Sequence, residues 1–175
     1  SRVAAISGAI GGYRDKNILE LGPLEGGHTT AMAKAGATRV TAIEANSRAF
    51  LKCLIVKEIL NLENVSFLLG DFDQFLEEDH RFDLVLACGV IYHCLNPIKT
   101  IVNICRSTDI IGIWSHYYRE EEVRRIYGDR FTHDPAMMEY GGISVPTYQH
   151  QYKQALKIKG FCGGGNASTY WMSME

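Results

Sequence analysis

Residues Ile18–Thr30, ILELGPLEGGHTT, carry the strongest indication of fold class in this sequence. It begins as an apolar strand with an acidic residue, Glu20, and passes through a turn with Gly22 and Gly26 into a helical pattern. A glycine has no Cβ, so the backbone of such a turn can approach a ligand closely. Leu24 stands where the dinucleotide fingerprint G-x-G-x-x-G has its second glycine, so a pyrophosphate-binding turn is disfavoured.

The theme of strand, turn and helix repeats along the chain. Five apolar runs predict buried parallel strands, because their apolar character is nearly continuous. These runs are Asn17–Leu21, Arg39–Ala45, Val65–Gly70, Phe82–Cys88 and Asp109–Ser115. Right-handed crossovers then predict an α/β fold with a Rossmann-like, doubly wound, mostly parallel sheet and helices on both faces. A ligand is expected beyond the carboxyl ends of the strands, at the switch point.

Helical patterns separate these strands. The expected helices are Thr29–Ala35, Ser47–Leu60, Phe72–Glu78 and a helix that starts at Asn96-Pro97 and runs to about Arg106. Gly36 is a natural stop for the first helix, and Ser47 is expected to cap the second. Beyond Ser115 the expected segments are a charged helix over Tyr118–Tyr127, an irregular insertion over Gly128–Pro146, a helix over Gln149–Lys159 and a turn at Gly163–Gly165.

Composition fits a globular protein. The 175 residues are 46% hydrophobic and 22% charged with a net charge of -2, so disordered classes fit poorly and no overall basic field exists to hold a phosphate backbone. Apolar stretches fall short of the roughly 18 residues of a membrane span, and we expect a cytoplasmic protein without a membrane partner. The cysteines are Cys53, Cys88, Cys94, Cys105 and Cys162. They include no C-x-x-C pair, so reduced thiols are expected.

Three further motifs follow the glycine turn in order. Glu44 ends the second strand, VTAIEAN, where a carboxylate can accept hydrogen bonds from both hydroxyls of a ribose. Gly70-Asp71-Phe72 closes the third strand, and residues 82–97, FDLVLACGVIYHCLNP, contain the fourth strand and the turn after it. With the first turn, these motifs resemble the class I S-adenosylmethionine-dependent methyltransferases over residues 13–116.

The resemblance implies an S-adenosyl-L-methionine site and methyl transfer to an acceptor. The implied positions are Glu20 under the methionine part, Gly22, Pro23 and Gly26 in the turn, Glu44 on the ribose, Ala45 beside the adenine, Asp71 and Phe72 at the adenine, and Cys88 and Gly89 along the methionine moiety. The methyl of a sulfonium is already electrophilic, so the protein needs mainly to align the acceptor and exclude water.

His93, just past the fourth strand, is the candidate catalytic base if the acceptor must lose a proton. The alternative is a structural histidine that holds the turn before Pro97. No metal is expected, because His116, His133 and His150 lie far apart without a ligand pattern. Aromatic residues after the fifth strand would suit a flat or apolar acceptor, although core packing explains them equally well.

The expected acceptor is a small molecule, with RNA as the weaker alternative. VIYHCLNP also resembles enzymes that modify the wobble uridine of transfer RNA, and Arg124, Arg125 and Arg130 form the basic cluster that could support an RNA partner. Two rivals come from other classes, an NAD-dependent oxidoreductase and a noncatalytic cofactor-binding module. The missing second glycine argues against the oxidoreductase. The noncatalytic module stays open, because methyl transfer needs no diagnostic nucleophile whose absence would reveal a loss of activity.

We expect a single domain over residues 1–175, with a lid over about residues 117–165, truncated at its C-terminus. Class I methyltransferases usually finish with a helix and an antiparallel pair of strands beside strand five. Ser168–Glu175 resembles the approach to that helix, with Ser173 as its N-cap, so the sheet should lack the hairpin and leave Asp109–Ser115 as an edge. The competing interpretation folds Gly160–Met174 into a short hairpin after a final helix over Gln149–Lys159.

Overall fold

A computed structural model describes residues 2–158, 160–161 and 166–174. Its chain forms two compact units, Ser1–Cys88 with Asn103–Trp114 and Gly89–Val102 with Ser115–Glu175. The single domain expected over the whole chain and its C-terminal truncation stay predictions. The predicted turn at Gly163–Gly165 and the thiol of Cys162 lie outside the described residues.

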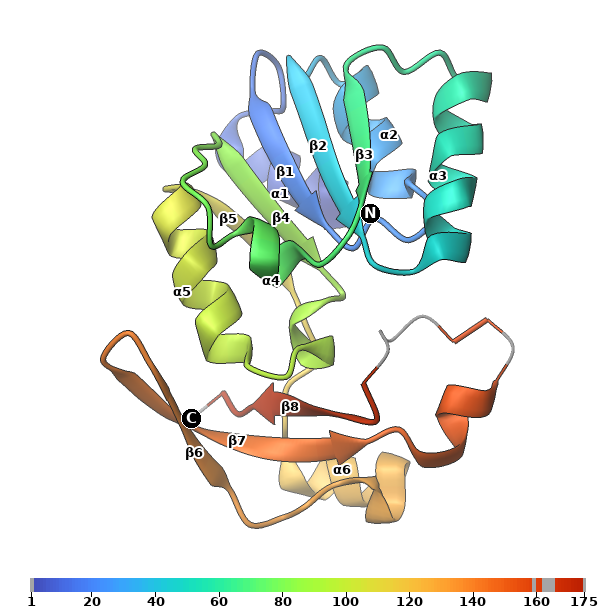
Figure 1. The fold of residues 1–175 in the computed structure, drawn as a ribbon. Helices are drawn as coiled ribbons and strands as arrows, with labels where there is room; N and C mark the ends of the chain where they lie inside the picture. The colour runs from blue at the N-terminus through green and yellow to red at the C-terminus, as the bar shows by residue number, and fades with distance from the viewer. Residues whose placement is uncertain (1, 159, 162–165, 175) are drawn as a thin grey trace. The chain divides into compact units, whose positions relative to one another are not determined.

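The first unit is built on a five-stranded parallel sheet (Figure 1). Its strands are β1 (Asn17–Leu21), β2 (Arg39–Glu44), β3 (Val65–Leu69), β4 (Leu84–Cys88) and β5 (Ile111–Trp114). They lie in the order β3-β2-β1-β4-β5, so the chain reverses its direction of winding between β1 and β4. The predicted doubly wound α/β fold is confirmed, and each strand lies within the range that its apolar run predicted.

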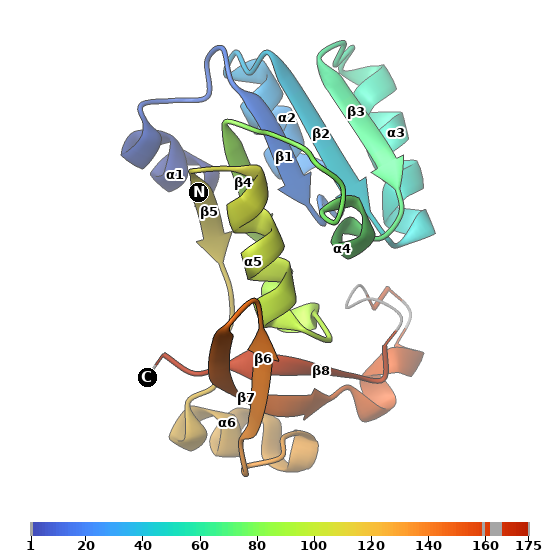
Figure 2. The ribbon, with the colours of Figure 1, turned by 60° about the vertical axis from the view of Figure 1, so that its left-hand side comes forward.

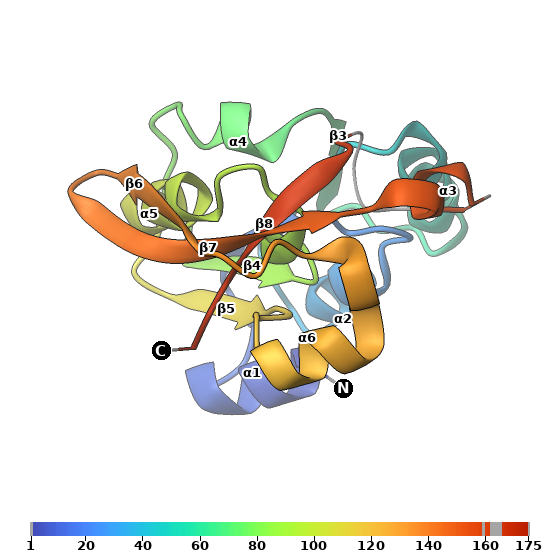
Figure 3. The ribbon, with the colours of Figure 1, turned by 90° about the horizontal axis from the view of Figure 1, so that it is seen from below.

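Helices cover both faces of this sheet. They are α1 (Arg2–Ile10), α2 (Gly27–Lys34), α3 (Ser47–Ile59), α4 (Phe72–Phe75) and α5 (Pro97–Ser107), which enters the first unit at Asn103. Figures 1 and 3 show α1 on one face and α4 on the other. On the α1 face, buried strand residues such as Ile18 and Leu84 pack with Met32 of α2 and Cys53 of α3. This core positions the carboxyl ends of β1 and β2.

The N-terminal cap of α3 differs from the prediction. Asn46, not Ser47, caps α3: its side-chain oxygen accepts from the backbone N–H groups of Arg48 and Ala49 at 3.0 and 3.1 Å. Asn46 has an extended backbone while Ser47 is already helical, so the side chain of Asn46 is the one that faces the free N–H groups. The helix α2 ends as predicted before Gly36, whose φ is +94°.

The second unit contains an antiparallel sheet in the order β6-β7-β8 (Figure 2). Its elements are η1 (Ile91–His93), the Pro97–Val102 part of α5, α6 (Glu120–Tyr127), η2 (Gly128–Arg130), β6 (Ala136–Tyr140), β7 (Ile143–Gln151), η3 (Lys153–Lys157) and β8 (Ser168–Met172). An irregular insertion over Gly128–Pro146 is therefore wrong. Gly141 and Gly142 have φ of +60° and +81°, which suits the two-residue turn of a β-hairpin.

One further prediction in this unit is wrong. The helix expected over Gln149–Lys159 is the end of β7 followed by the short η3, because Gln149 and Gln151 pair with β8. Ser173 forms an isolated parallel bridge with Tyr118, and its role as the N-cap of a following helix stays a prediction. Within the described residues β8 pairs with β7, and β5 pairs with β4 alone. The sheet of the first unit therefore lacks a C-terminal hairpin in the described part of the chain, as expected.

The core of the second unit is aromatic. Tyr118, Phe131 and Trp171 are buried together with Val123 of α6. The rings of Tyr118 and Tyr148 stack at 3.5 Å between centroids. The helix α6 forms as predicted, since it carries acidic residues in its first turn, basic residues in its last turn and one buried apolar residue. No helix in the described part of the chain is long and apolar enough to span a membrane.

Candidate functional site

Glu44 ends β2 with a carboxylate that is 7% exposed. Its Oε2 accepts from the backbone N–H of Leu24 at 2.9 Å, and its Oε1 accepts from the backbone N–H of Asn46 at 2.8 Å. The donors come from the turns after β1 and β2, so two fixed backbone groups orient the carboxylate. A carboxylate has about four acceptor positions, so both oxygens keep capacity to accept from a ligand.

Glu20 lies in β1, one residue before the strand ends, and is 2% exposed. Its Oε2 accepts from the hydroxyl of Thr29, and its Oε1 lies 3.5 Å from Nδ1 of His28. Both partners belong to the first turn of α2. A buried carboxylate beside the first turn of a helix is stabilised by these partners and by the positive end of the helix dipole.

The turn between β1 and α2 uses the left-handed backbone region three times. Gly22, Leu24 and Gly26 have φ of +62°, +57° and +75°. The N–H of Gly22 donates to the carbonyl of Ile43 at 2.9 Å, which ties the turn to β2. Leu24 takes a conformation that favours glycine, and this directs its N–H to Glu44. The glycine-like geometry is therefore present where the fingerprint glycine is missing.

Close packing at Gly26 adds to the preference for glycine that its positive φ creates. A Cβ added there would lie 3.2 Å from Cζ of Phe67 in β3 and 3.7 Å from Sγ of Cys53. The absent side chain therefore makes room for the protein's own core, a reason that the sequence analysis missed. Pro23 is buried in the same turn, and its carbonyl accepts from the N–H of Gly26 at 2.9 Å.

The remaining expected cofactor residues follow the next strands. Asp71 is exposed and caps α4, because its Oδ1 accepts from the N–H of Asp73 at 2.8 Å. Phe72 is partly buried, and Ala45 is exposed after Glu44. Asp71 thus has a structural task of its own, in addition to any contact with a ligand.

Cys88 ends β4 and is partly buried. Burial, and next the charge of Glu20, raise the pKa of its thiol, against the opposing charge of Arg2. Gly89 follows it with φ +86° and belongs to the second unit. The structure thus brings the expected residues, apart from Gly89, to the carboxyl ends of the strands of the first unit.

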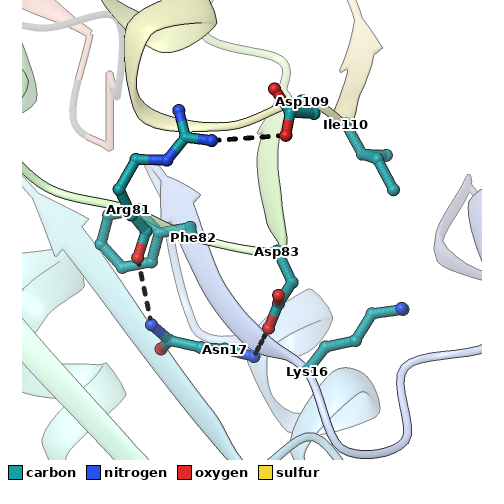
Figure 4. Close-up of a pocket in the computed structure, with 7 residues that line it drawn as sticks. All are labelled: Lys16, Asn17, Arg81, Phe82, Asp83, Asp109 and Ile110. Atoms are coloured by element: carbon teal, nitrogen blue, oxygen red, sulfur yellow. Dashed lines mark hydrogen bonds and ion pairs between the residues drawn. The ribbon is translucent and has the colours of Figure 1, made fainter.

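The first unit also has a pocket of about 330 Å³ at its opposite edge (Figure 4). Two of its charged side chains pair with each other, Arg81 with Asp109 at 3.3 Å, and a third, Asp83, accepts from the backbone N–H of Asn17 at 2.7 Å. The pocket lies where β1, β4 and β5 begin. It is therefore separate from the candidate cofactor residues, which lie where strands end.

His93 lies in the second unit, at the end of η1, and is partly buried. Its Nδ1 forms a hydrogen bond with the hydroxyl of Tyr152, which in turn accepts from the hydroxyl of Thr169 at 3.4 Å. Burial first, and then the charges of His150 and His116, lower the pKa of His93 to about 4. Burial raises the pKa of Tyr152 to about 12. The pair is therefore neutral near pH 7.

His150 is 4% exposed within the same aromatic core. Its ring lies 4.7 Å from Phe131, 4.8 Å from Tyr152 and 5.3 Å from Trp171, measured between centroids. Burial, and next the charge of Arg130, lower its pKa to about 4. Neither ring nitrogen has a hydrogen-bond partner among the described residues. No local pattern in the sequence indicated that His150 would influence the pKa of His93.

The other histidines and the basic cluster are spread out. His116 stacks on Trp171 at 5.4 Å, and His133 bonds through Nδ1 to the hydroxyl of Tyr118 at 2.8 Å. The described residues contain no group of three or more potential ligands that could hold a metal. In the basic cluster, Arg124 donates twice to Glu120, at 2.8 and 2.9 Å, so part of its charge is neutralised.

The strand order, the glycine-bearing turn and the buried acids at the ends of β1 and β2 define the class I methyltransferase fold. A sequence profile of the methyltransferase domain family matches residues 13–160. The chain belongs to this family. The resemblance stated from the four sequence motifs is therefore confirmed.

Individual proteins similar to this chain share less than a third of their aligned residues with it. The N-terminal domain of EvdMO1, solved with SAH bound, is 22% identical with a TM-score of 0.69, and the match covers 99% of this chain and 65% of that one. The tRNA U34 carboxymethyltransferase of Cellvibrio japonicus is 29% identical over 96 residues, which are 54% of this chain and 30% of that protein. The enzyme of the same name from Methylococcus capsulatus is 28% identical over 99 residues, 57% and 31% of the two chains. The matched segments span less than a third of the length of these curated relatives.

Proposed function

We propose that this domain binds S-adenosyl-L-methionine and transfers its methyl group to an acceptor. The observation that carries the proposal is the Glu44 carboxylate, which is buried at the end of β2 and oriented by two backbone N–H groups. Such a group is ready to accept two further hydrogen bonds from the vicinal hydroxyls of a ribose. When bound, the cofactor supplies a methyl group that a sulfonium has made electrophilic.

The other residues of the first unit fit the same ligand. Glu20 is a buried acid suited to the cationic end of the methionine part. At Gly22 and Gly26 the backbone of the turn carries no side chain, and Pro23 adds only its ring, so these residues can lie close to the ligand. The proposed adenine contacts are Ala45, Asp71 and Phe72, and the proposed contacts along the methionine part are Cys88 and Gly89. These roles rest on placement at the carboxyl ends of the strands.

His93 is better suited to donate a hydrogen bond than to act as a base. We propose that the hydroxyl of Tyr152 accepts from the hydroxyl of Thr169 and directs its own proton to Nδ1 of His93. This leaves the proton of the neutral imidazole on Nε2. A pKa of about 4 also makes His93 a weak base near pH 7. We therefore propose that His93 orients the acceptor by donating from Nε2.

The proposed acceptor is a small molecule, and a transfer RNA is the second candidate. The net charge of -2 and the pairing of Arg124 with Glu120 disfavour a phosphate backbone as partner. The RNA candidate is favoured by the curated relatives, which are tRNA U34 carboxymethyltransferases. Acceptor screening with labelled cofactor separates them, since label should enter low-molecular-weight products in the first case and tRNA in the second.

Calorimetry tests the cofactor proposal without an acceptor. S-adenosylhomocysteine should bind more tightly than NAD, and Glu44→Ala should weaken that binding by about 1.5–3 kcal/mol, as the loss of a charged hydrogen-bond partner does. The matched control is Glu63→Ala, which removes an exposed carboxylate elsewhere in the first unit. Tighter binding of NAD, or equal affinity of the two variants, would reject the proposed site. Binding without any methyl transfer would support a noncatalytic module.

A further inference from the structure

The helix α3 has two apolar faces. Ala49 and Cys53 are buried against the sheet, while Leu51, Ile55 and Ile59 are 58%, 57% and 75% exposed. These three are spaced four residues apart, so they form one ridge along the outer side of the helix. Figure 1 shows α3 at the β3 end of the sheet. Single exposed apolar residues are ordinary, but a continuous ridge on one helix is typical of a contact surface.

The ends of this ridge carry charges that do not suit the helix itself. Arg48 lies in the first turn of α3 and Glu58 in the last, where the helix dipole disfavours each sign. Neither has an ion pair within the described residues, whereas Lys52 between them pairs with Glu25. The two charges therefore cost helix stability and gain nothing from this chain.

We infer that α3 is the contact between two copies of this chain, paired antiparallel about a two-fold axis between Leu51 and Ile55. In this arrangement Leu51 packs on Ile55 of the second copy, and Arg48 faces Glu58 of the second copy. The two-fold repeats both contacts. Arg48 and Glu58 are ten residues, about 15 Å, apart along the helix, so both pairs form at once.

The charge pattern selects a second copy as occupant. A parallel pair would place Arg48 against Arg48 and Glu58 against Glu58, whereas the antiparallel pair compensates both charges twice. The ridge offers few side chains compared with the roughly 20–30 residues a side of a standard interface. The dimer is therefore weak and depends on concentration.

Sedimentation equilibrium of the whole chain tests this arrangement. Arg48→Glu and Glu58→Arg should each raise the dimer dissociation constant at least roughly tenfold, because each places like charges opposite one another. The double variant Arg48→Glu/Glu58→Arg restores opposite charges and should return to within about threefold of the original value. Ile55→Glu should abolish the dimer. Each charge reversal suits the helix dipole, so the variants should fold, and circular dichroism verifies it.

Glu63→Arg, outside α3, is the control and should leave the dissociation constant unchanged. A chain that stays monomeric up to about 1 mM, beyond the range of specific association, overturns the inference and leaves the ridge to another occupant. A dimer that tolerates Ile55→Glu, or a double variant no tighter than the single ones, overturns it as well. None of these results bears on cofactor binding, which calorimetry measures separately.

Discussion

The two units treat buried polar groups in opposite ways. In the first unit, Glu20 and Glu44 are almost fully buried, and each carboxylate is held by hydroxyl or backbone N–H donors. In the second unit, His93 and His150 are buried among aromatic rings, and burial lowers the pKa of both to about 4. Fixed donors compensate a buried carboxylate, whereas aromatic rings favour neutral imidazoles.

Among the predicted changes in stability, the greatest is expected for a substitution in the aromatic core, and it should affect the second unit alone. Trp171→Ala removes a buried ring that contacts Phe131 at 4.8 Å and Tyr127 at 5.4 Å, and should destabilise this unit by about 3–5 kcal/mol. Hydrogen exchange should show lost protection in β7 and β8 with β1 and β2 unchanged. Tyr117→Ala, which truncates an exposed ring, is the control. Equal loss of protection in both units would show that they unfold together.

Acid should weaken the second unit through its histidines. In the unfolded chain an imidazole has a pKa near 6.5, so between pH 6.5 and 4 the unfolded state binds protons that folded His93 and His150 do not. The free energy of unfolding should therefore fall as the pH falls, by roughly 1 kcal/mol per pH unit for each histidine. Urea unfolding followed by Trp171 fluorescence in a Trp114→Phe background measures it.

His150→Phe separates the contribution of this histidine from general acid effects. The substitution replaces buried nitrogens that lack partners among the described residues, so it should raise stability by about 1 kcal/mol at pH 7 and by more at pH 5. A variant whose stability difference does not change with pH would contradict the low pKa of His150.

Removal of the Tyr152 hydroxyl should have a smaller effect. Tyr152→Phe leaves Nδ1 of His93 without this hydrogen-bond donor and should cost about 1 kcal/mol. Nitrogen-15 NMR should find the proton of His93 on Nε2 in the original chain, with the tautomer preference reduced in the variant. Tyr170→Phe, which removes the hydroxyl of a partly buried tyrosine in β8, is the matched control. A proton on Nδ1 in the original chain would restore His93 as a candidate base.

The smallest effect concerns the first unit. Leu24→Gly relieves a positive φ of +57° while keeping the backbone N–H that reaches Glu44, so stability should rise by about 0.5 kcal/mol. Leu24→Ala keeps the strained φ and should bring no gain. Thermal unfolding with S-adenosylhomocysteine present and absent compares the two. A loss of stability in the glycine variant would show that the Leu24 side chain, not its backbone, matters.

The first unit could be predicted from the sequence because its central strands β1, β2 and β4 are buried on both faces. Such strands are continuous apolar runs, and runs such as Arg39–Ala45 end at punctuated turns. The positions of Glu20 and Glu44 followed from the strand ends. Their hydrogen-bond donors did not, because the N–H of Leu24 reaches Glu44 only through an unusual φ that no residue type announces.

The second unit was harder to predict because its strands have weak apolar patterns and its contacts join residues far apart in the sequence. The hairpin of β6 and β7 carries its signal in Gly141-Gly142, but most residues of the flanking strands are exposed or only partly buried, and they lack a clear apolar alternation. The strand β8 pairs across a gap of many residues with β7. The bond from Tyr152 to His93 joins positions 59 residues apart, and no local pattern predicts it.

The packing of Gly26 against Phe67 bears on how this turn would change over evolutionary time. A descendant that lost its ligand would still have the positive φ of this residue and the tight approach of a Cβ to Phe67, so selection for folding alone would favour this glycine. Leu24 is different, because its strained φ serves the orientation of Glu44. Drift at positions 24 and 44, with Gly26 unchanged, would therefore mark a lineage in which the fold had outlived its chemistry.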